Sequence, residues 1–265
     1  MPSDLIKNTS PLRYPGGKTR ARGVLFKLLC EKFKTDSLTQ VVSPFFGGGS
    51  FEFHLQATLG YDIIANDKFT PLTNFWLTAK ENNTELVTAL QAQSVDKGLF
   101  LRFREEVMND PDRLSQAMKF FVINRCSFSG ATLSGGFSQE ASQKRFTESS
   151  IARVKALNLS KATFHNLDFT DFLAMQTEDA LIFADPPYYL ESKSRLYGKN
   201  GDLHETFDHQ ALAAILKTKA NWMLTYNDCP EIRNLYNDYE IHTVAWSYGM
   251  NKSKKSSEIV IINTS

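Results

Sequence analysis

The fold of this chain is decided by the stretch Ala180-Leu181-Ile182-Phe183-Ala184-Asp185-Pro186-Pro187-Tyr188. Its first five residues form an apolar run that predicts a buried strand, and the last four predict a turn at the carboxyl end of that strand. The prolines lack backbone N–H donors and stiffen the turn, so carbonyl oxygens point outward. Asp185 adds an anionic acceptor, and Tyr188 adds a flat apolar face. This corner can grip a planar group that carries an NH2, although ordinary strand-ending turns use the same residue types.

Two earlier apolar runs also lead into turns with chemically active residues. Val41-Val42 precedes Ser43-Pro44-Phe45-Phe46-Gly47-Gly48-Gly49-Ser50, and Ile63-Ile64-Ala65 precedes Asn66-Asp67. Patterns of helical period follow at 51–59, 71–79 and 207–216. Strands that alternate with helices predict an α/β sheet that is mostly parallel. Such sheets bind ligands beyond the carboxyl ends of their strands, near a switch in strand order, so we expect the three turns to form one site.

The remaining segments predict two additions to this sheet. Residues 222–226 and 258–263 read as further strands, and 241–248 is expected to pair antiparallel with the final one. Residues 100–108 and 114–122 have the pattern of amphipathic helices, and a polar tract with glycines follows them. We therefore predict a catalytic domain of residues 1–79 and 151–265. The inserted subdomain, residues 80–150, is expected to be mainly helical, with a hairpin or loop near 124–145.

Composition limits the class of protein. The chain has 265 residues, of which 42% are hydrophobic, and a formal net charge of +1, which is typical of one globular domain with an insertion. Its three cysteines lack the spacing of metal ligands, and no run has the length of a signal peptide or a membrane span. We expect a cytoplasmic protein. Basic residues near the N-terminus form either a solvated helix face or a local attraction for a polyanion; they are Arg13, Lys18, Arg20, Arg22, Lys27, Lys32 and Lys34.

The glycine turn and the acid that follows it indicate a small ligand. The turn at 45–49 lets the backbone approach a ligand closely, but it has neither the phosphate-loop pattern nor the full dinucleotide pattern, so ATP and NAD are disfavoured. Asp67 ends the next strand, where a carboxylate accepts hydrogen bonds from both ribose hydroxyls. The alternative for Asp67 is a helix N-cap.

Two other stretches carry candidate binding residues. In Arg13-Tyr14-Pro15-Gly16-Gly17-Lys18, Tyr14 can pack on a flat or sulfonium group and Lys18 can pair with a carboxylate; a turn that starts a helix is the alternative. In Phe164-His165-Asn166-Leu167-Asp168-Phe169, Asp168 can accept from an adenine amino group while Phe169 flanks the ring. Asp168 can equally cap the helix expected at 170–174.

Together these motifs resemble the Dam-like DNA adenine-N6 methyltransferases over nearly the whole chain. The similar stretches are Tyr-Pro-Gly-Gly-Lys at 14–18, Pro-Phe-Phe-Gly-Gly-Gly-Ser at 44–50, Ala-Asn-Asp at 65–67, the segment from Asn124 to Gly130, Asp-Pro-Pro-Tyr at 185–188 and the closing segment 254–263. The resemblance implies a Rossmann-like methyltransferase sheet with an antiparallel C-terminal strand pair and a helical target-recognition insertion.

The resemblance also implies S-adenosylmethionine as cofactor and no metal. Tyr14 and Lys18 would line its methionine end, and Asp67 would hold its ribose. Asp168 and Phe169 would hold its adenine, and Asp185 would sit where the cofactor meets the target base. The cradle around it would be Phe46, Gly47, Gly48 and Gly49.

The implied reaction is a direct methyl transfer to an adenine amino nitrogen. Asp185 and the Pro186 carbonyl would each accept one N6 proton and so localise the nitrogen lone pair, in a corner that Pro187 completes. The target base must flip out of duplex DNA, and Tyr188 would stack on it.

Double-stranded DNA is the implied partner. The residues expected to contact it are Asn124, Arg125, Ser127, Phe128, Ser129, Lys144 and Arg145. Arg125 would contact a phosphate or a guanine edge, or else form a structural ion pair. Residues 130–145 lack a stretch like Asn-Val-Pro-Phe-Gly, which accompanies GATC recognition, so the sequence does not predict GATC as the target.

Three hypotheses stay open at this point, and a DNA adenine-N6 methyltransferase is the favoured one. A related enzyme would methylate cytosine N4, RNA or a protein glutamine amide, although glutamine-directed relatives tend to have Asn in place of Asp185. A degenerate DNA-binding module is the third. We expect a monomer or weak dimer from a prokaryotic cell, phage or mobile element, with a cognate restriction enzyme as a possible partner.

Overall fold

The computed structural model describes residues 5–14, 16–128, 132–176, 180–189, 207–245 and 257–264. Within these ranges a single seven-stranded sheet has the order β3-β2-β1-β4-β5-β7-β6. The strands are β1 (Gln40–Ser43), β2 (Asp62–Asn66), β3 (Ala162–His165), β4 (Leu181–Ala184), β5 (Trp222–Asn227), β6 (Glu240–Ala245) and β7 (Ser257–Asn263).

The strand order places a topological switch between β1 and β4. The first five strands pair in parallel, and β7 pairs antiparallel with both β5 and β6. This confirms the predicted α/β sheet and its antiparallel C-terminal pair. From β1 the chain continues through β2 and β3 on one side, then returns to β4 and β5 on the other. The carboxyl ends of β1 and β4 therefore border the crevice where such sheets bind ligands.

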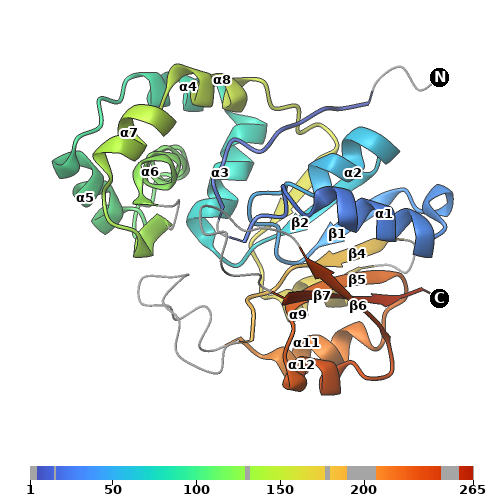
Figure 1. The fold of residues 1–265 in the computed structure, drawn as a ribbon. Helices are drawn as coiled ribbons and strands as arrows, with labels where there is room; N and C mark the ends of the chain where they lie inside the picture. The colour runs from blue at the N-terminus through green and yellow to red at the C-terminus, as the bar shows by residue number, and fades with distance from the viewer. Residues whose placement is uncertain are drawn as a thin grey trace.

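Helices cover both faces of the sheet (Figure 1). On one face lie α1 (Arg22–Lys32), α2 (Glu52–Leu59) and α3 (Thr70–Glu81); on the other lie α9 (Phe169–Ala174), α11 (His209–Leu216) and α12 (Pro230–Leu235). A hydrophobic core lies on each face of the sheet, and alternate residues of β4 contribute to the two cores. Leu181 and Phe183 pack toward α1–α3, whereas Ile182 and Ala184 pack toward α9 and α11. The strand reads as one apolar run because both of its faces are buried.

The insertion forms a helical layer beside α3 (Figure 1). It consists of α4 (Asn83–Gln91), α5 (Lys97–Glu106), α6 (Arg113–Cys126), α7 (Gln139–Arg145) and α8 (Glu148–Lys155), with the short 3-10 turn η3 (Thr132–Ser134) before α7. A second 3-10 turn, η1 (Thr35–Ser37), lies outside the insertion and precedes β1. The helices continue past the predicted border at 150, because Thr147 and Ser150 exchange hydrogen bonds in a capping box that starts α8. The domain boundaries themselves stay a prediction.

The predicted hairpin near 124–145 is shorter than expected. Helix α6 runs on to Cys126, and only one antiparallel bridge, Ser127 with Phe137, joins the two arms in the described part of this segment. The returning arm then forms α7, which Ser138 caps by accepting a hydrogen bond from the Ala141 N–H. Local capping therefore converts most of the second arm into helix.

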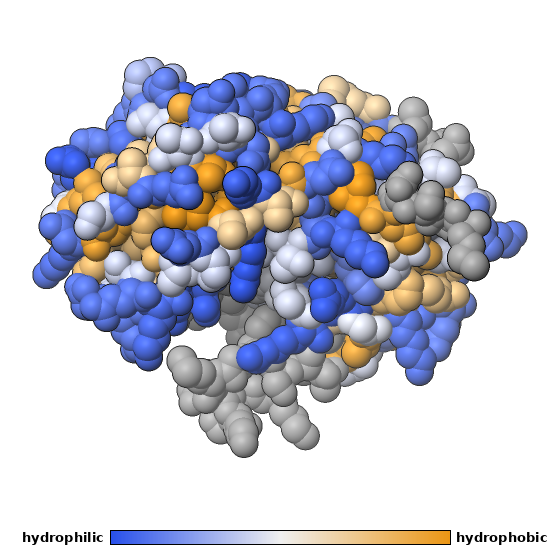
Figure 2. Space-filling view, turned by 90° about the horizontal axis from the view of Figure 1, so that it is seen from above, coloured by the Kyte–Doolittle hydropathy of each residue, from blue (hydrophilic) through white to orange (hydrophobic). Residues whose placement is uncertain are grey.

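The surface seen from above is mixed in character (Figure 2). Hydrophilic residues cover most of this face, and hydrophobic residues gather in patches between them. No helix in the described ranges is long and apolar enough to span a membrane.

Aromatic rings shape the glycine turn that joins β1 to α2. Gly47 and Gly49 have φ angles of +51° and +64°, which strain any residue with a Cβ atom. A Cβ on Gly49 would lie 2.3 Å from the ring of Phe46, and one on Gly47 would lie 2.9 Å from the ring of Tyr14. The turn is therefore closed by the protein's own side chains on both sides.

We predict that Gly49→Ala lowers the free energy of unfolding by about 1–3 kcal/mol, because it combines backbone strain with overpacking against Phe46. Urea denaturation measures this effect. Gly136→Ala is the matched control, since a Cβ there meets nothing within 4 Å. A loss of stability equal to that of the control would show that the turn tolerates a side chain.

Candidate functional site

Asp185 lies at the carboxyl end of β4 and is held by two donors from distant parts of the chain. Lys18 Nζ lies 2.7 Å from Asp185 Oδ1 and 2.8 Å from Oδ2. The Thr225 hydroxyl, on the neighbouring strand β5, donates to Oδ1 at 2.6 Å. The Lys18 side chain is 3% exposed and that of Asp185 is 20% exposed. The carboxylate is thus fixed in orientation while one edge still meets solvent.

Tyr188 belongs to the same network. Its hydroxyl accepts a hydrogen bond from Lys18 Nζ at 3.0 Å and donates to Glu258 Oε2 at 2.5 Å. Glu258 is buried on β7, opposite Asn227 of β5. The ring of Tyr188 is half-buried and its hydroxyl end is held from two sides. These contacts fix the tilt of an aromatic face beside Asp185.

Thr225 and Glu258 were not among the residues expected at this site. Both belong to segments that were predicted as strands, where a polar side chain among apolar ones is the only available signal. Their distance from Asp185 and Tyr188 depends on the antiparallel register of β5 and β7. That register is set by pairing along the whole length of both strands. The sequence around Thr225 or around Glu258 alone therefore does not reveal the register.

Lys18 has charged and polar partners within the protein itself. We expected its ammonium group to pair with a carboxylate of the ligand, whereas the structure pairs it with Asp185 and with the carbonyl oxygen of Gly16 at 3.1 Å. The physical reason is burial: an ammonium group this deep requires a charged partner from the protein itself.

A second carboxyl group is buried close to Asp185. Glu52, at the start of α2, accepts a hydrogen bond from the Ser43 hydroxyl at 2.6 Å. Burial raises the pKa of Glu52 to about 7; hydrogen bonds from Ser43 and the backbone oppose that rise, and the charge of Asp185 adds to it. Near neutral pH this group is therefore partly protonated, which limits the negative charge gathered beneath the site.

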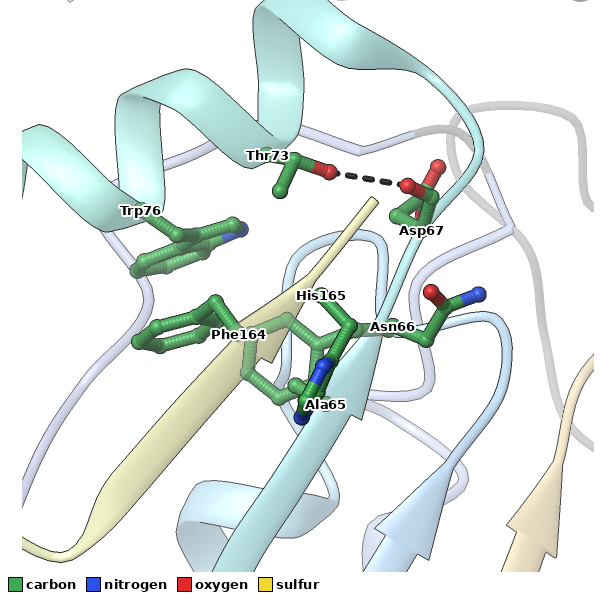
Figure 3. A pocket seen from close by; sticks show the side chains of 8 residues that line it. Ala65, Asn66, Asp67, Thr73, Trp76, Phe164 and His165 are labelled. Atoms are coloured by element: carbon green, nitrogen blue, oxygen red, sulfur yellow. Dashed lines mark hydrogen bonds between the residues drawn. The ribbon is translucent and has the colours of Figure 1, made fainter. Parts of the chain in front are cut away.

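Asp67 ends β2 and borders a small recess (Figure 3). Its two oxygens accept hydrogen bonds from the N–H groups of Gly47 at 2.9 Å and Phe69 at 3.0 Å. Burial raises the pKa of Asp67 to about 6, although both backbone hydrogen bonds act to lower it. The N-cap of α3 is Phe69, so the predicted alternative role of Asp67 as helix cap is wrong. Its carboxylate instead ties the glycine turn to the end of β2.

The recess beside Asp67 is walled by aromatic rings. Trp76 and Phe164 stack with an interplanar angle of 6° (Figure 3). Phe46 packs edge-on against both of them and is 3% exposed. Phe46 therefore supports the turn from within the core while also lining the recess, and its contact with the cofactor stays a prediction. Tyr14 lies over Gly47 on the opposite side.

Asp168 and Phe169 lie at the carboxyl end of β3. Asp168 caps α9 by accepting from the Thr170 N–H at 3.0 Å, and it pairs with Lys68 at 2.8 Å. Partial burial acts to raise the pKa of Asp168, but the bonds from Lys68 and Thr170 outweigh it and lower that pKa. The capping role is thus confirmed. Phe169 is nearly buried against the rings of Phe45 and Phe207.

The residues expected to contact DNA divide into buried and exposed groups. Asn124, Arg125 and Ser127 are buried. Asn124 exchanges hydrogen bonds with the backbone of Arg13. Arg125 donates to the carbonyl oxygens of Arg145 and Pro11 and has no carboxylate partner among the described residues, so the alternative of a structural ion pair is wrong. Contact of these three residues with DNA stays a prediction.

The other described residues of this set are exposed or half-buried. Phe128 is 66% exposed beside the bridge at Ser127, an unusual position for a large aromatic side chain. Lys144 is exposed and pairs with Glu140 within α7, and Arg145 is half-buried at the end of the same helix. Ser129 lies outside the described residues. Contact of these residues with DNA stays a prediction.

The sequence of this chain is similar to those of known proteins. The profile of the family described as D12 class N6 adenine-specific DNA methyltransferase matches residues 14–250. Two curated relatives, both named DNA adenine methylase, come from Vibrio cholerae serotype O1 strains ATCC 39541 and ATCC 39315. Each is 23% identical over 226 residues, which cover 77% of this chain and 78% of the relative.

The solved structures that match include a precorrin 8w decarboxylase from Methanobacterium thermoautotrophicum, which is 12% identical and gives a TM-score of 0.39 with full coverage of both chains. This likeness is too low to inform the fold or the site. In the described ranges no cluster of three or more His, Cys, Asp or Glu residues could hold a metal ion.

We predict that Tyr188 and Glu258 are energetically coupled. Tyr188→Phe and Glu258→Ala should each destabilise the protein, and the double variant should lose about 1–2 kcal/mol less than the sum, because both changes remove the same hydrogen bond. Urea denaturation of the four proteins measures the coupling free energy. Additive losses would contradict the contact.

Proposed function

Because the chain belongs to the D12 class of N6 adenine-specific DNA methyltransferases, it is an enzyme that methylates adenine N6 in DNA, and we propose that Asp185 is where the transfer occurs. The observation that supports this most directly is the position of the Asp185–Tyr188 corner. It lies at the carboxyl end of β4, next to β1 at the switch in strand order, and Lys18 and Thr225 fix its carboxylate.

Methyltransferases in general use S-adenosylmethionine, and the residues around the glycine turn fit such a group. Each oxygen of Asp67 accepts one backbone N–H, so each has capacity left for a ribose hydroxyl. Gly47 to Gly49 and Tyr14 border the same edge of the sheet, and Asp168 with Phe169 ends the neighbouring strand. We propose that these residues bind the cofactor. When bound, it would supply a methyl group activated by a sulfonium.

The protein's own contribution to the reaction is to prepare the adenine nitrogen. The lone pair of an adenine amino group is delocalised into the ring, so the group is a poor nucleophile. Asp185 Oδ1 already accepts from Thr225 and Lys18, whereas Oδ2 accepts from Lys18. Since a carboxylate oxygen takes about two hydrogen bonds, Oδ2 has a place for one N6 proton. The Pro186 carbonyl accepts the other, and Pro187 stiffens the turn that presents it.

These two hydrogen bonds localise the lone pair on nitrogen and stabilise the positive charge that develops there. Lys18 also donates to Gly16 and Tyr188, so one ammonium group fixes the carboxylate and the tyrosine hydroxyl together. We therefore assign Lys18 to positioning Asp185 and Tyr188, in place of the ligand carboxylate that the sequence suggested. A carboxylate that is already oriented lowers the activation barrier to methyl transfer, because its side chain need not reorganise during the reaction.

The target atom lies inside duplex DNA, so the adenine must flip out to reach Asp185. We propose that the half-buried ring of Tyr188 stacks on the extruded base, a contact worth about 1–3 kcal/mol in other proteins. Phe128, with its exposed ring, is proposed to contact the bases nearby. We propose a monomer or weak dimer that acts in the cytoplasm, where prokaryotic DNA lies, with a restriction enzyme as a possible partner.

We predict that Asp185→Asn reduces the rate of methyl transfer by at least about 100-fold, because an amide in place of the carboxylate stabilises the developing positive charge poorly. The assay uses S-adenosylmethionine with a labelled methyl group and mixed duplex DNA, followed by digestion to nucleosides. Label should appear in N6-methyladenosine. DNA affinity should change little.

Asp171→Asn is the matched control, because Asp171 is exposed on α9 and away from this network. Wild-type label in N4-methylcytosine would refute adenine as the target, and an active Asp185→Asn enzyme would refute the role of this carboxylate. Sequencing the methylated DNA gives the recognition sequence in the same experiment.

The pKa of Asp67 predicts how cofactor affinity depends on pH. Ribose hydroxyls donate to the ionised carboxylate, so binding should be strong above pH 6 and weaken as the pH falls through about 6. Below pH 6 the affinity for the cofactor should fall by nearly tenfold for each pH unit. Titration calorimetry with S-adenosylhomocysteine between pH 5 and 8 measures it.

Asp67→Asn should bind more weakly at pH 8 and should remove this dependence on pH. In the free protein the sign is opposite: the pKa of Asp67 is raised above its value in the unfolded chain, so this group adds stability as the pH falls from about 6 toward 4. A wild-type affinity that stays constant from pH 8 to 5 would exclude Asp67 from the binding site.

A further inference from the structure

The N-terminal strap, residues 11–18, connects the helical insertion to the corner at Asp185; Pro15 within it lies outside the described residues. In Figure 1 this stretch runs beside the insertion before the chain turns back to α1. Asn124, near the end of α6, binds the strap through both ends of its side-chain amide. Its Oδ1 accepts from the Arg13 N–H at 2.9 Å, and its Nδ2 donates to the Arg13 carbonyl oxygen at 2.7 Å. The insertion therefore holds the strap by its backbone.

The orientation of the Asn124 amide is fixed by these two hydrogen bonds. Rotating the amide by half a turn would set its NH2 group against the Arg13 N–H and its oxygen against the Arg13 carbonyl, so both bonds would be lost. Two hydrogen bonds to one residue are also what a neighbouring antiparallel strand makes. Asn124 is fully buried on a helix of 14 residues that packs against α3, α5 and α7. A rigid element thus holds a stretch whose described residues form no helix or strand.

Tyr14 is the next residue of the strap, and it lies against the glycine turn. A Cβ on Gly47 would come within 2.9 Å of the Tyr14 ring, and one on Gly48 would lie 3.3 Å from the Tyr14 Cβ atom. The Tyr14 carbonyl oxygen accepts from the Gly17 N–H at 3.0 Å, which closes a turn just before Lys18. Only this closed turn separates the residue that α6 holds from the ammonium group that reaches the site.

Lys18 connects the position of the strap to that of the carboxylate. Its Nζ donates to the Gly16 carbonyl oxygen at 3.1 Å and to Asp185 Oδ2 at 2.8 Å. Because one ammonium group is bonded both to the strap backbone and to Asp185, a shift of the strap strains or breaks one of these bonds. The Lys18 side chain is buried, so water cannot readily replace the partner that it loses. The orientation of Asp185 therefore depends on where the strap lies.

We propose that Asn124 is a positioning residue for methyl transfer: by holding the backbone at Arg13, it fixes the strap that places Lys18 on Asp185. This inference rests on the proposed function, because it takes Asp185 as the point of transfer. It gives the insertion a role in the chemical step besides contact with DNA. The placement matters because a displacement of about 1 Å, caused by a change far from the reacting atoms, can lower a rate by about 100-fold.

Hydrogen exchange of backbone amides in Asn124→Ala tests the strap without any reaction. The Arg13 N–H should exchange faster by NMR, because it loses its acceptor. The Gly17 N–H should also exchange faster, although it bonds to Tyr14, because the strap is released as a unit. Asn83→Ala is the matched control, since Asn83 also donates to two backbone carbonyl oxygens and makes no hydrogen bond to the strap. Faster exchange at Arg13 with unchanged exchange at Gly17 would overturn the proposal.

The rate of methyl transfer in a single turnover tests the effect on the chemical step. With S-adenosylmethionine and duplex DNA both saturating, Asn124→Ala should be slower than the wild type by roughly 10- to 100-fold, whereas Asn83→Ala should keep the wild-type rate. DNA affinity without cofactor should not change, because the strap occupies the Asn124 amide. Equal losses of rate in the two variants would overturn the proposal. A loss that saturating substrates restore, or weaker DNA binding with normal exchange at Gly17, would overturn it as well.

Asn124→Asp provides a second variant of nearly equal size. It keeps an oxygen for the Arg13 N–H but sets a carboxylate against the Arg13 carbonyl oxygen, which repels it. Faster exchange at Gly17 and slower transfer should both appear again, and wild-type behaviour of this variant would overturn the proposal. The two measurements also separate this inference from the proposed function. A wild-type protein that methylates no adenine would refute the proposed function, while the exchange rates would still show whether Asn124 holds the strap.

Discussion

The contact between Lys18 and Asp185 is the interaction on which the rest of this structure depends. It joins a residue near the N-terminus to the carboxyl end of a central strand, and both partners are largely withdrawn from water. A charge in that position is stable only with its partner in place, so neither residue can be considered alone. Thr225, Tyr188 and Glu258 extend the contact across β5 and β7. The reactive corner is thus a network held by the sheet, in which four separate stretches of the chain take part.

Much of the fold could be predicted from the sequence because its signals are local. Three short patterns each predict the end of a strand: the apolar run before Asp185, the glycine turn after β1 and the acid after β2. The structure brings all three to one edge of the sheet. The order of these motifs also identified the family correctly. The capping role of Asp168 and the antiparallel pairing of β6 with β7 follow from equally short patterns, although residues 246–248 of the predicted strand lie outside the described residues.

What the sequence could not predict depends on contacts between distant residues. Lys18 was assigned to a ligand because no local pattern shows that Asp185 lies within reach. Asn124 and Arg125 were assigned to an exposed loop, since polar residues usually lie outside; their partners are backbone groups of Arg13, Pro11 and Arg145. Glu258 was missed for the same reason. In each case a buried polar side chain is satisfied by a segment far away in the chain, and only the folded arrangement reveals it.

The position of β7 has a consequence for how the enzyme is made. This strand follows β6 in the chain but lies between β5 and β6 in the sheet. During synthesis, β5 therefore emerges with a bare edge, and its neighbour arrives only after β6 has left the ribosome. Glu258 travels on that late strand. An incomplete nascent chain consequently has an exposed strand that other chains could join, and Tyr188 lacks its acceptor Glu258, so the final step of sheet assembly also completes the network around Asp185.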